Sequence, residues 1–554
     1  MAPLIPRRIG LLFAVFLVLL AAAALKTLWL GTVQGSTLRD AAATQQAKEL
    51  KVPARRGAIV DRHGVELAVT EPADDVSATP YLVKDAPAAA RKIAPILKQP
   101  EEDVLKKLAR RDTGFVYLAR NLPSKQSRAL QKLNITGLQF TPTNNRLYPR
   151  NWLASQVLGR VGVDGKGLSG LEYSQDHLLR GRDGTRRIVK DALGEAISVR
   201  DPDPVEPGAK LTLTLDANIQ DKVEEVLQEV GAKYRPKGAT AVVMDPRSSD
   251  ILAMANWPRV DNNALEDAPD YARQNRAVAF TYEPGSTFKA FTVAGALEDG
   301  KTTPETRYDL PPQIQVADRT IGESHPRGYV NLSTKEILSQ SSNVGAIKIG
   351  MSLGDERFDY WVRRFGFGKK TGVDLPGEES GLLLDVKDYS GSSMGNLPIG
   401  QGESVTPMQM AGAYAAIANG GILRPPRMVR SVDGERRPLT KGQRVISPAT
   451  ASSLREMLRG VLDPTGTASE ASVPGYQLAG KTGTANKVDE QTGEYSASRY
   501  IASFVGFAPA KQPKLLVSVM VDEPQGAIYG GEVAAPAFQK ITSFALTYLR
   551  IPPE

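Results

Sequence analysis

Ser286 and Lys289 are a serine and a lysine three residues apart, the spacing that nucleophilic catalysis by an activated hydroxyl can use. Pro284 and Gly285 interrupt the preceding structure, and an apolar pattern with helical spacing follows as far as Glu298. On a helix the two side chains lie on one face, about one turn apart. The serine would stand at the helix N-terminus, where free N–H groups favour developing negative charge. The lysine can remove the hydroxyl proton only if burial or a neighbouring cation lowers its pKa.

A second polar cluster, Ser341-Ser342-Asn343, precedes an apolar run with helical character. Serine and asparagine at such a place often do no more than cap a helix. In a catalytic site, Ser341 could relay a proton to a leaving amine and Asn343 could hold a substrate backbone.

A third cluster, Lys481-Thr482-Gly483-Thr484, has the composition of an exposed strand edge. The same residues could bind a substrate carboxylate through the lysine and the two threonine hydroxyls. Gly483 would leave room for a peptide to lie against the strand.

Three rival motifs lack the context that their chemistry needs. Residues 165–170 match the dinucleotide fingerprint, but no long buried strand precedes them. Residues 475–482 match a nucleotide-binding P-loop, but no strand precedes them and no helical pattern follows. Residues 391–395 match a nucleophile elbow, which requires a later histidine, and none follows His325.

Composition narrows the remaining classes of function. A chain of 554 residues is expected to form two or three domains. Its net charge of +8 is not gathered into a dense basic run with interleaved aromatics, so we expect no nucleic-acid partner. The absence of cysteine excludes disulfides, thiolate metal sites and a cysteine nucleophile. The three histidines are far apart and form no metal-ligand cluster in the sequence.

The N-terminus predicts a membrane anchor. Arg7 and Arg8 precede an apolar run from Ile9 to about Leu30, which only Lys26 interrupts and which is long enough to span a bilayer. The two arginines place the short N-terminal side in the cytoplasm. A cleaved signal peptide is the alternative, with a cleavage site at Ala21–Ala24, but the apolar run continues past that site.

The rest of the chain predicts an α+β fold. Residues 33–50 are polar and alanine-rich, which indicates a helical or flexible stalk, and Pro204 to Pro207 mark a domain boundary. Strands at both ends of the last segment, with helices between, favour an antiparallel sheet covered by helices. The expected strands are 211–215, 239–245, 251–255, 500–507 and 514–521, and the expected helices are 217–233, 407–420 and 536–549.

Taken together, the three clusters resemble, in order and spacing, the three motifs of penicillin-binding proteins and serine β-lactamases. Residues 56–64, 148–149 and 170–172 resemble the N-terminal pedestal domain of the class B penicillin-binding proteins, and 400–409 resemble a segment near their cleft. The resemblance covers nearly the whole chain. It implies five regions: a cytoplasmic tail (1–8), a transmembrane anchor (9–30), a juxtamembrane stalk (31–52), a class B pedestal or dimerisation-type domain (53–205) and a transpeptidase domain (206–554).

The resemblance implies D,D-transpeptidation of peptidoglycan stem peptides through an acyl-serine, with β-lactams as inhibitors and no metal or organic cofactor. Lys289 would activate Ser286, and Ser341 would pass a proton to the departing D-alanine. Asn343 would hold the donor peptide, and the N–H groups of Ser286 and Thr484 would form the oxyanion hole. The residues that would bind the substrate are Lys481, Thr482, Gly483 and Thr484.

Within class B, Asn343 followed by Val344-Gly345 is closest to the division transpeptidases (FtsI-type, penicillin-binding protein 3), whereas the elongation paralogue usually has aspartate. That subtype implies a single-pass protein of the bacterial inner membrane, with a periplasmic catalytic domain. It also implies division-complex membrane partners, including a lipid II-polymerising glycosyltransferase, and leaves homodimerisation open. No extra repeat domain follows residue 554, which resembles the Gram-negative form. The alternatives are an elongation-type transpeptidase, a D,D-carboxypeptidase or β-lactamase, a β-lactam sensor and a scaffold.

Overall fold

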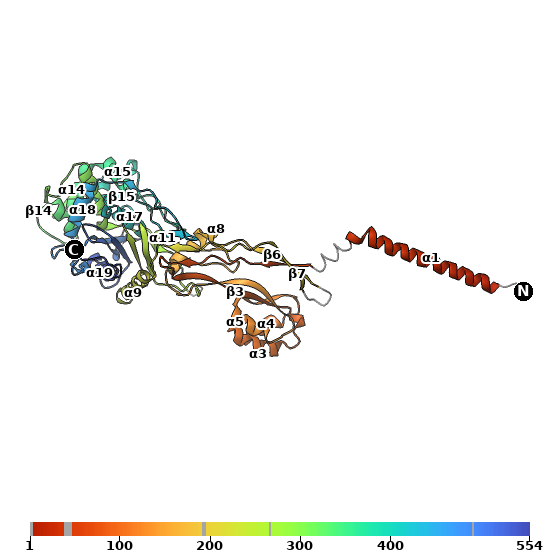
Figure 1. The fold of residues 1–554 in the computed structure, drawn as a ribbon. Coiled ribbons are helices and arrows are strands. Elements are labelled where there is room, and N and C mark those ends of the chain that lie inside the picture. Colours follow the sequence, from red (N-terminus) through yellow and green to blue (C-terminus); the bar gives the residue numbers. More distant parts are fainter. Residues whose placement is uncertain (1–3, 38–46, 191–195, 265–267, 490–491, 554) are drawn as a thin grey trace. The chain divides into compact units, whose positions relative to one another are not determined.

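The computed structural model describes residues 4–37, 47–190, 196–264, 268–489 and 492–553 (Figure 1). The chain divides into two compact units. The first contains Met1–Arg55, Ala73–Thr143 and Gly181–Pro207, and the second contains Arg56–Pro72, Asn144–Arg180 and Gly208–Glu554. The predicted boundary at 205/206 lies beside the last of these junctions. A single boundary does not describe the division, because two segments of the predicted pedestal domain fold with the second unit.

The first element is α1 (Leu4–Thr32), a helix of 29 residues (Figure 1). Its segment Ile9–Thr32 is apolar and long enough to cross a membrane, and its side chains are not packed inside the protein. The predicted span of 9–30 therefore lies on one continuous helix, as expected for a membrane anchor.

A three-stranded antiparallel sheet in the first unit has the order β1-β6-β7, from β1 (Ala47–Val52), β6 (Gly184–Lys190) and β7 (Ala196–Asp203). The prediction of a helical or flexible stalk over 33–50 is therefore wrong for residues 47–50, which lie in β1. The register pairs Lys51 with Thr185, far away in the sequence. Local patterning could not reveal β1, because its partner is distant and its own residues do not alternate clearly between apolar and polar.

The remaining elements of the first unit enclose a separate small core. Ile93, Val104 and Leu130 are fully buried within it. Its elements are the second half of β3 (Glu66–Ala78), η1 (Pro80–Leu82), α3 (Ala86–Leu97), α4 (Glu101–Leu108), β4 (Val116–Pro123), α5 (Ser124–Gln131) and the first part of β5 (Leu138–Leu147).

The second unit is built on a five-stranded antiparallel sheet with the order β10-β9-β21-β20-β19. The strands are β9 (Gly238–Asp245), β10 (Asp250–Trp257), β19 (Ala479–Val488), β20 (Tyr495–Ala508) and β21 (Leu515–Asp522). The predicted hairpin at 239–255 and the two late strands are confirmed. Within this sheet β19 is an edge strand, which leaves one side of its backbone unpaired with a neighbouring strand.

Each face of this sheet packs against helices. Successive side chains of a strand point to opposite faces. In β9, Ala241 and Val243 accordingly join the core that includes α9 (Ala217–Tyr234) and α19 (Gly530–Tyr548), whereas Val242 and Met244 join the core beneath α12 (Lys289–Glu298) and α17 (Pro407–Ala418).

The helix starts show which sequence signals were decisive. Asp216 caps α9 by accepting from Asn218 N and Ile219 N, and Thr406 forms a capping box with Gln409 at α17, as their residue types predict. The predicted start of α19 at Pro536 is wrong, because the helix begins at Gly530 and contains that proline.

Shorter elements complete the second unit. They are β2 (Ile59–Val60), α6 (Ser155–Leu158), α7 (Gly170–Ser174), α8 (Asp176–Leu179), β8 (Leu211–Leu213), α10 (Asp270–Arg273), α11 (Arg276–Ala279), η3 (Gly285–Phe288), β11 (Arg307–Leu310), β12 (Gln313–Val316), β13 (Arg319–Gly322), β14 (Val330–Ser333), α13 (Thr334–Ser339), α14 (Asn343–Leu353), α15 (Asp355–Arg364), η4 (Val386–Asp388), α16 (Ser393–Asn396), η5 (Leu397–Ile399), β15 (Ile422–Leu423), β16 (Val429–Val432), β17 (Glu435–Arg436), β18 (Gln443–Arg444), α18 (Pro448–Arg459) and η6 (Ser469–Ala471).

Candidate active site

Ser286 lies in η3, a single 3₁₀ turn that leads into α12, and its own side chain is partly exposed. Gly285 adopts a φ of +54°, and its N–H donates to Gly400 O at 2.9 Å. A Cβ at Gly285 would stand 2.9 Å from Thr484 O, so a larger residue would push the turn away from β19. The turn therefore holds the serine at the start of a helix and against an edge strand.

Lys289, the first residue of α12, is fully buried, and its ammonium group contacts the second cluster. Its Nζ donates to Ser341 O at 2.7 Å and to Asn343 Oδ1 at 2.6 Å, and lies 3.3 Å from Ser341 Oγ. Burial lowers the pKa of Lys289 to about 7, even though the negative charge of Glu323 acts in the opposite direction. A large fraction of this lysine is therefore neutral near pH 7, as a general base requires.

The second cluster both caps a helix and contacts the lysine. Ser342 is the N-cap of α14, and its Oγ accepts from Gly345 N at 3.0 Å. Ser341 has a left-handed φ of +61°, which is strained for a residue with a side chain. The capping interpretation therefore holds for Ser342, whereas Ser341 and Asn343 are the residues that meet Lys289.

The third cluster lies on β19, beside the serine turn. A Cβ at Gly483 would stand 2.9 Å from Pro284 O and from Thr287 Cγ2, so the strand and the turn are in close contact. Lys481 is fully buried. Burial, followed by the nearby charge of Lys289, lowers the pKa of Lys481 well below its usual value. A substrate carboxylate would supply the counter-charge that favours an ammonium group here.

Hydrogen bonds from two other segments fix the side chains of the cluster 481–484. Thr482 Oγ1 shares a hydrogen bond of 2.8 Å with Thr467 Oγ1, and Thr484 Oγ1 accepts from Gly530 N at 3.1 Å. Gly530 begins α19 so close to Gly483 O that a side chain would not fit. The sequence analysis missed this contact, although the glycine pair Gly530-Gly531 could have signalled it.

The structure therefore brings all three predicted clusters together within the second unit. It also explains why the rival motifs do not apply. The residues of the P-loop match that follow position 478 enter the strand β19, whereas a P-loop opens a helix. The dinucleotide match at 165–170 leads into α7, a helix of five residues, and a bridge between Val161 and Gly167 takes the place of a parallel strand.

Two acidic residues behind the serine turn were not predicted as part of the site. Glu283 Oε1 accepts from Gly402 N at 3.0 Å and from Tyr495 OH at 3.1 Å, which ties the turn to β20. Glu403 is 2% exposed, and among the described residues neither of its carboxylate oxygens has a hydrogen-bond partner. Burial, together with the charge of Glu283, raises the pKa of Glu403 well above its usual value.

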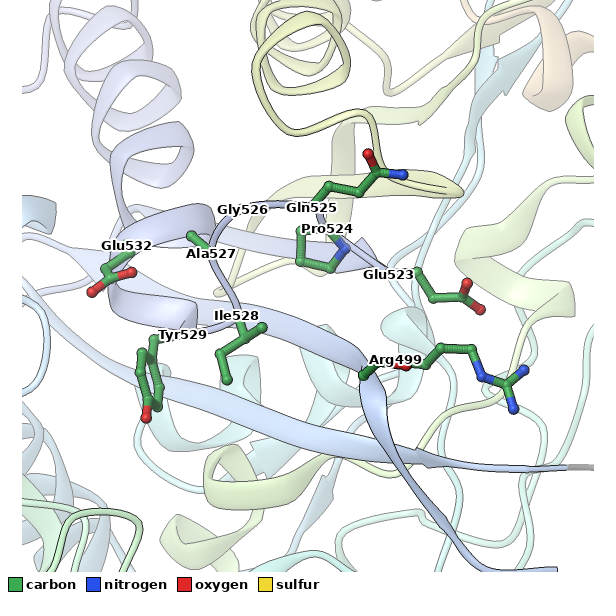
Figure 2. Close-up of a pocket in the computed structure, with 10 residues that line it drawn as sticks. Arg499, Glu523, Pro524, Gln525, Gly526, Ala527, Ile528, Tyr529 and Glu532 are labelled. Carbon is green, nitrogen blue, oxygen red and sulfur yellow. The ribbon is translucent and has the colours of Figure 1, made fainter. Parts of the chain in front are cut away.

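A pocket of about 470 Å³ lies beside the loop from β21 to α19 (Figure 2). The loop supplies Glu523 to Tyr529, and Arg499 comes from β20. No residue of the three clusters lines this pocket, so it is not the catalytic centre. Tyr529, which lines the pocket, precedes Gly530 in the chain, and Gly530 N donates to Thr484 Oγ1.

Two family models and several curated relatives match this chain. Residues 239–543 match the family described as penicillin binding protein transpeptidase domain, and residues 51–213 match the penicillin-binding protein dimerisation domain. The chain is 36% identical to penicillin-binding protein PbpB of Mycolicibacterium smegmatis, over 97% of this chain and 89% of that protein. It is 31% identical to peptidoglycan D,D-transpeptidase FtsI of Escherichia coli, over 99% of this chain and 92% of that protein.

A solved structure has the same fold. The crystal structure of penicillin-binding protein 3 from Mycobacterium tuberculosis, complexed with aztreonam, superimposes with a TM-score of 0.71 at 32% identity. The match covers 91% of this chain and 98% of that chain.

Proposed function

This chain belongs to the class B penicillin-binding proteins, a family of serine D,D-transpeptidases, and on that premise we propose that Ser286 is its acylating nucleophile and Lys289 the base. The observation that carries the proposal is the buried Lys289 Nζ, which is bonded to Ser341 and Asn343 and has a pKa of about 7. Lysine with an ordinary pKa, near 10.4, would be almost fully protonated at neutral pH and a poor base.

In the acylation step, neutral Lys289 takes the hydroxyl proton as Ser286 Oγ attacks the carbonyl carbon between the two terminal D-alanines. The tetrahedral intermediate collapses by breaking the C–N bond. Ser341 passes a proton to the departing D-alanine amine and takes back the proton that Lys289 holds, which leaves both side chains neutral. The distance of 3.3 Å between Lys289 Nζ and Ser341 Oγ supports this relay.

The charge that develops on the carbonyl oxygen would be held by the N–H groups of Ser286 and Thr484. One such donor is typically worth about 10²- to 10³-fold in rate. The packing of η3 against β19 supports the pairing, because it brings the two backbones into contact.

Binding of the donor peptide would use both flanking clusters. Lys481, Thr482 and Thr484 would bind its terminal carboxylate, and Gly483 would let the peptide lie along the edge strand. Asn343 would hold the peptide backbone, since its Nδ2 has a second hydrogen beyond the one donated to Gly322 O.

In the second step, an amine of a neighbouring stem attacks the acyl-serine carbonyl carbon and forms the cross-link. The ester C–O bond breaks, and a proton lost by the amine passes through Lys289 to Ser286 Oγ. A D,D-carboxypeptidase or β-lactamase would use water instead of the amine. The test is to supply a donor peptide ending in D-Ala-D-Ala with and without an acceptor amine. We expect cross-linked dimer to exceed hydrolysed donor, and acceptor-independent hydrolysis alone would contradict the proposal.

We assign the chain to the division subtype on the Asn343-Val344-Gly345 sequence of the second motif. Depletion in the host cell tests this assignment. Filaments that elongate but do not divide are the expected result, whereas rounded cells would favour the elongation subtype.

The cellular setting follows from α1 and from that subtype. The chain would cross the inner membrane once, with its N-terminus in the cytoplasm, and would work in a division complex that includes a lipid II-polymerising glycosyltransferase. Crosslinking between the chain and this enzyme in growing cells would test the association, and its absence during septation would contradict it. Homodimerisation stays an open prediction.

A further inference from the structure

Glu323 follows β13 and reaches the start of α14, although it belongs to none of the three clusters. Its Oε2 accepts from Asn343 N at 2.6 Å, and its Oε1 accepts from Val344 N at 3.3 Å and from Ser342 Oγ at 2.7 Å. The side chain is only 6% exposed. One carboxylate therefore satisfies free N–H groups of the helix and the hydroxyl that caps it.

The same segment fixes the orientation of the Asn343 side chain. Gly322 O accepts from Asn343 Nδ2 at 2.9 Å, so the amide presents its other end, Oδ1, to Lys289 Nζ. Because an amide has one donor end and one acceptor end, anchoring the donor end sets where the acceptor points.

The left-handed Ser341 needs support of this kind. A residue with a side chain keeps such a conformation only where its surroundings impose it. Glu323 holds the next two residues, Ser342 and Asn343. Arg327 adds to this support, since it forms an ion pair with Glu323 and its Nη2 donates to Ser342 Oγ at 2.9 Å.

We propose that Glu323 is a positioning residue for the reaction, which sets the geometry of the second cluster and the charge of the base through its carboxylate. The proposal rests on the roles proposed above for Ser286 and Lys289. Glu323 does not touch substrate in this scheme. It acts through Ser341, Asn343 and Lys289.

The effect of Glu323 on the pKa of Lys289 depends on the charges around this lysine. Two charged groups face it: Glu323, which follows β13, and Lys481 on β19. Arg327 lies one ion pair further away, on Glu323. Burial would raise the pKa of Glu323, but hydrogen bonds from Arg327 and from the start of α14 outweigh it, so the carboxylate stays ionised near neutral pH. Its charge opposes the effect of burial on the pKa of Lys289.

The test is Glu323→Gln in the full-length chain in detergent, with the rate of acylation by a penicillin measured from pH 5 to pH 9. We expect the rate at high pH to fall about 10- to 100-fold, because hydrogen bonds to a charged group are lost at the second cluster. On the acid side of the pH–rate profile, the rate rises as Lys289 loses its proton, and we call this rise the acid limb. We also expect the acid limb to move to lower pH, because removing a negative charge lowers the pKa of Lys289. A purely structural role would not move that limb.

Glu336→Gln is the matched control. Glu336 forms a capping box with Ser333 at the start of the adjacent helix α13, so the substitution also removes a carboxylate from a helix start, at a more exposed position. We expect its acid limb to stay at the wild-type pH. Glu323→Gln with a wild-type rate, or with a slower rate and an unmoved limb, would overturn the proposal.

If Glu323→Gln does not fold, Glu323→Asp takes over the test. It keeps the charge but shortens the reach, so we expect slower acylation with the acid limb unmoved, and a wild-type rate would overturn the proposal. Failure of the proposed function is distinguishable, because the wild-type chain would then gain no adduct on Ser286. If the wild-type chain gains an adduct on Ser286 but the Glu323 variants keep the wild-type rate and pH profile, only the role of Glu323 is contradicted.

Discussion

At the scale of single residues, burial lowers the pKa of Lys289 to about 7, which in the proposed mechanism sets the pH at which the site can work. Its ammonium group has three oxygen neighbours, from Ser341 and Asn343, and the negative charge of Glu323 also acts on it. With a pKa of about 7, the lysine changes from acid to base within the physiological range.

The first prediction concerns this titration. The rate of acylation by a penicillin should rise with pH through about 7, because only the neutral form of Lys289 accepts the serine proton. Lys289→Met should reduce the rate by about 10²- to 10⁴-fold, the usual contribution of a general base, and should remove the acid limb. Stopped-flow or quenched labelling across pH measures both effects.

Lys348→Met is the control for that experiment, since Lys348 lies on α14 and donates to Asp309 O at an exposed position. It should keep the wild-type rate and profile. A Lys289→Met variant that retains the wild-type limb would show that another group is the base.

The second prediction concerns Glu403. Its pKa is raised in the folded chain, so the protonated carboxyl contributes stability that is fully present below the unfolded pKa of about 4.3 and is lost as pH rises through the folded value. The loss approaches about 1.4 kcal/mol per pH unit in that window. Glu403→Gln is neutral at every pH, so its unfolding temperature relative to wild type should increase from pH 5 to pH 8.

Calorimetry of the full-length chain in detergent can follow this difference, with Glu356→Gln as a control at an exposed carboxyl on α15. Parallel pH dependence of wild type and Glu403→Gln would show that Glu403 ionises normally.

Residue types and spacing, together with the family resemblance, singled out three clusters that the structure then brings together. They could not predict Glu323 or Glu403. Folding brings Glu323 to the start of α14 and buries Glu403 in the interior. Neither residue stands in a sequence pattern that indicates chemistry.

At the scale of elements, the contact between η3 and β19 assembles the site. Gly285 and Gly483 let the serine turn and the edge strand approach each other, and Gly530 lets α19 begin behind that strand. The serine turn and the edge strand are therefore positioned by backbone contact more than by side chains.

The third prediction is that Gly483→Ala separates these elements. Its Cβ would meet Ser503 Oγ, Pro284 O and Thr287 Cγ2, and two of these three are atoms of the serine turn and its approach. We expect acylation to fall at least about tenfold, which corresponds to roughly 1.4 kcal/mol, while circular dichroism stays native.

Gly412→Ala provides the comparison, because a Cβ on this glycine of α17 would contact no described atom within 4 Å apart from the adjacent residues and the helix's own backbone. That substitution should leave acylation unchanged and stabilise the helix by up to about 1 kcal/mol. Equal acylation in Gly483→Ala and wild type would contradict the role given to this contact.

The elements were predictable where a local signal exists and not elsewhere. The caps at Asp216 and Thr406 are local, and both helices begin where those residues predict. The proline rule misplaced the start of α19, because the helix accommodates Pro536 in its interior. β1 depends on a partner strand that begins at Gly184, which no local pattern could reveal.

At the scale of the whole molecule, the proposed orientation of α1 would put the catalytic unit outside the cytoplasm. The fourth prediction uses the absence of cysteine to test its orientation. Single cysteines introduced as Ala2→Cys and Ser36→Cys flank the helix. In spheroplasts, a membrane-impermeant maleimide should label Ser36→Cys, whereas Ala2→Cys should react only after lysis.

The cysteine-free wild-type chain is the blank for this labelling. The reverse pattern would place the catalytic unit in the cytoplasm. Labelling of both positions in intact spheroplasts would show that α1 does not span the membrane.

The most direct test of the central claim is the intact mass of the chain after incubation with a penicillin, followed by peptide mapping. We predict one stable adduct with the full mass of the drug, on the peptide that contains Ser286, and no adduct in Ser286→Ala with native circular dichroism. An adduct on another residue, or intact drug with no adduct, would contradict the assignment of Ser286 as the nucleophile. Hydrolysed drug with no adduct would point to a β-lactamase.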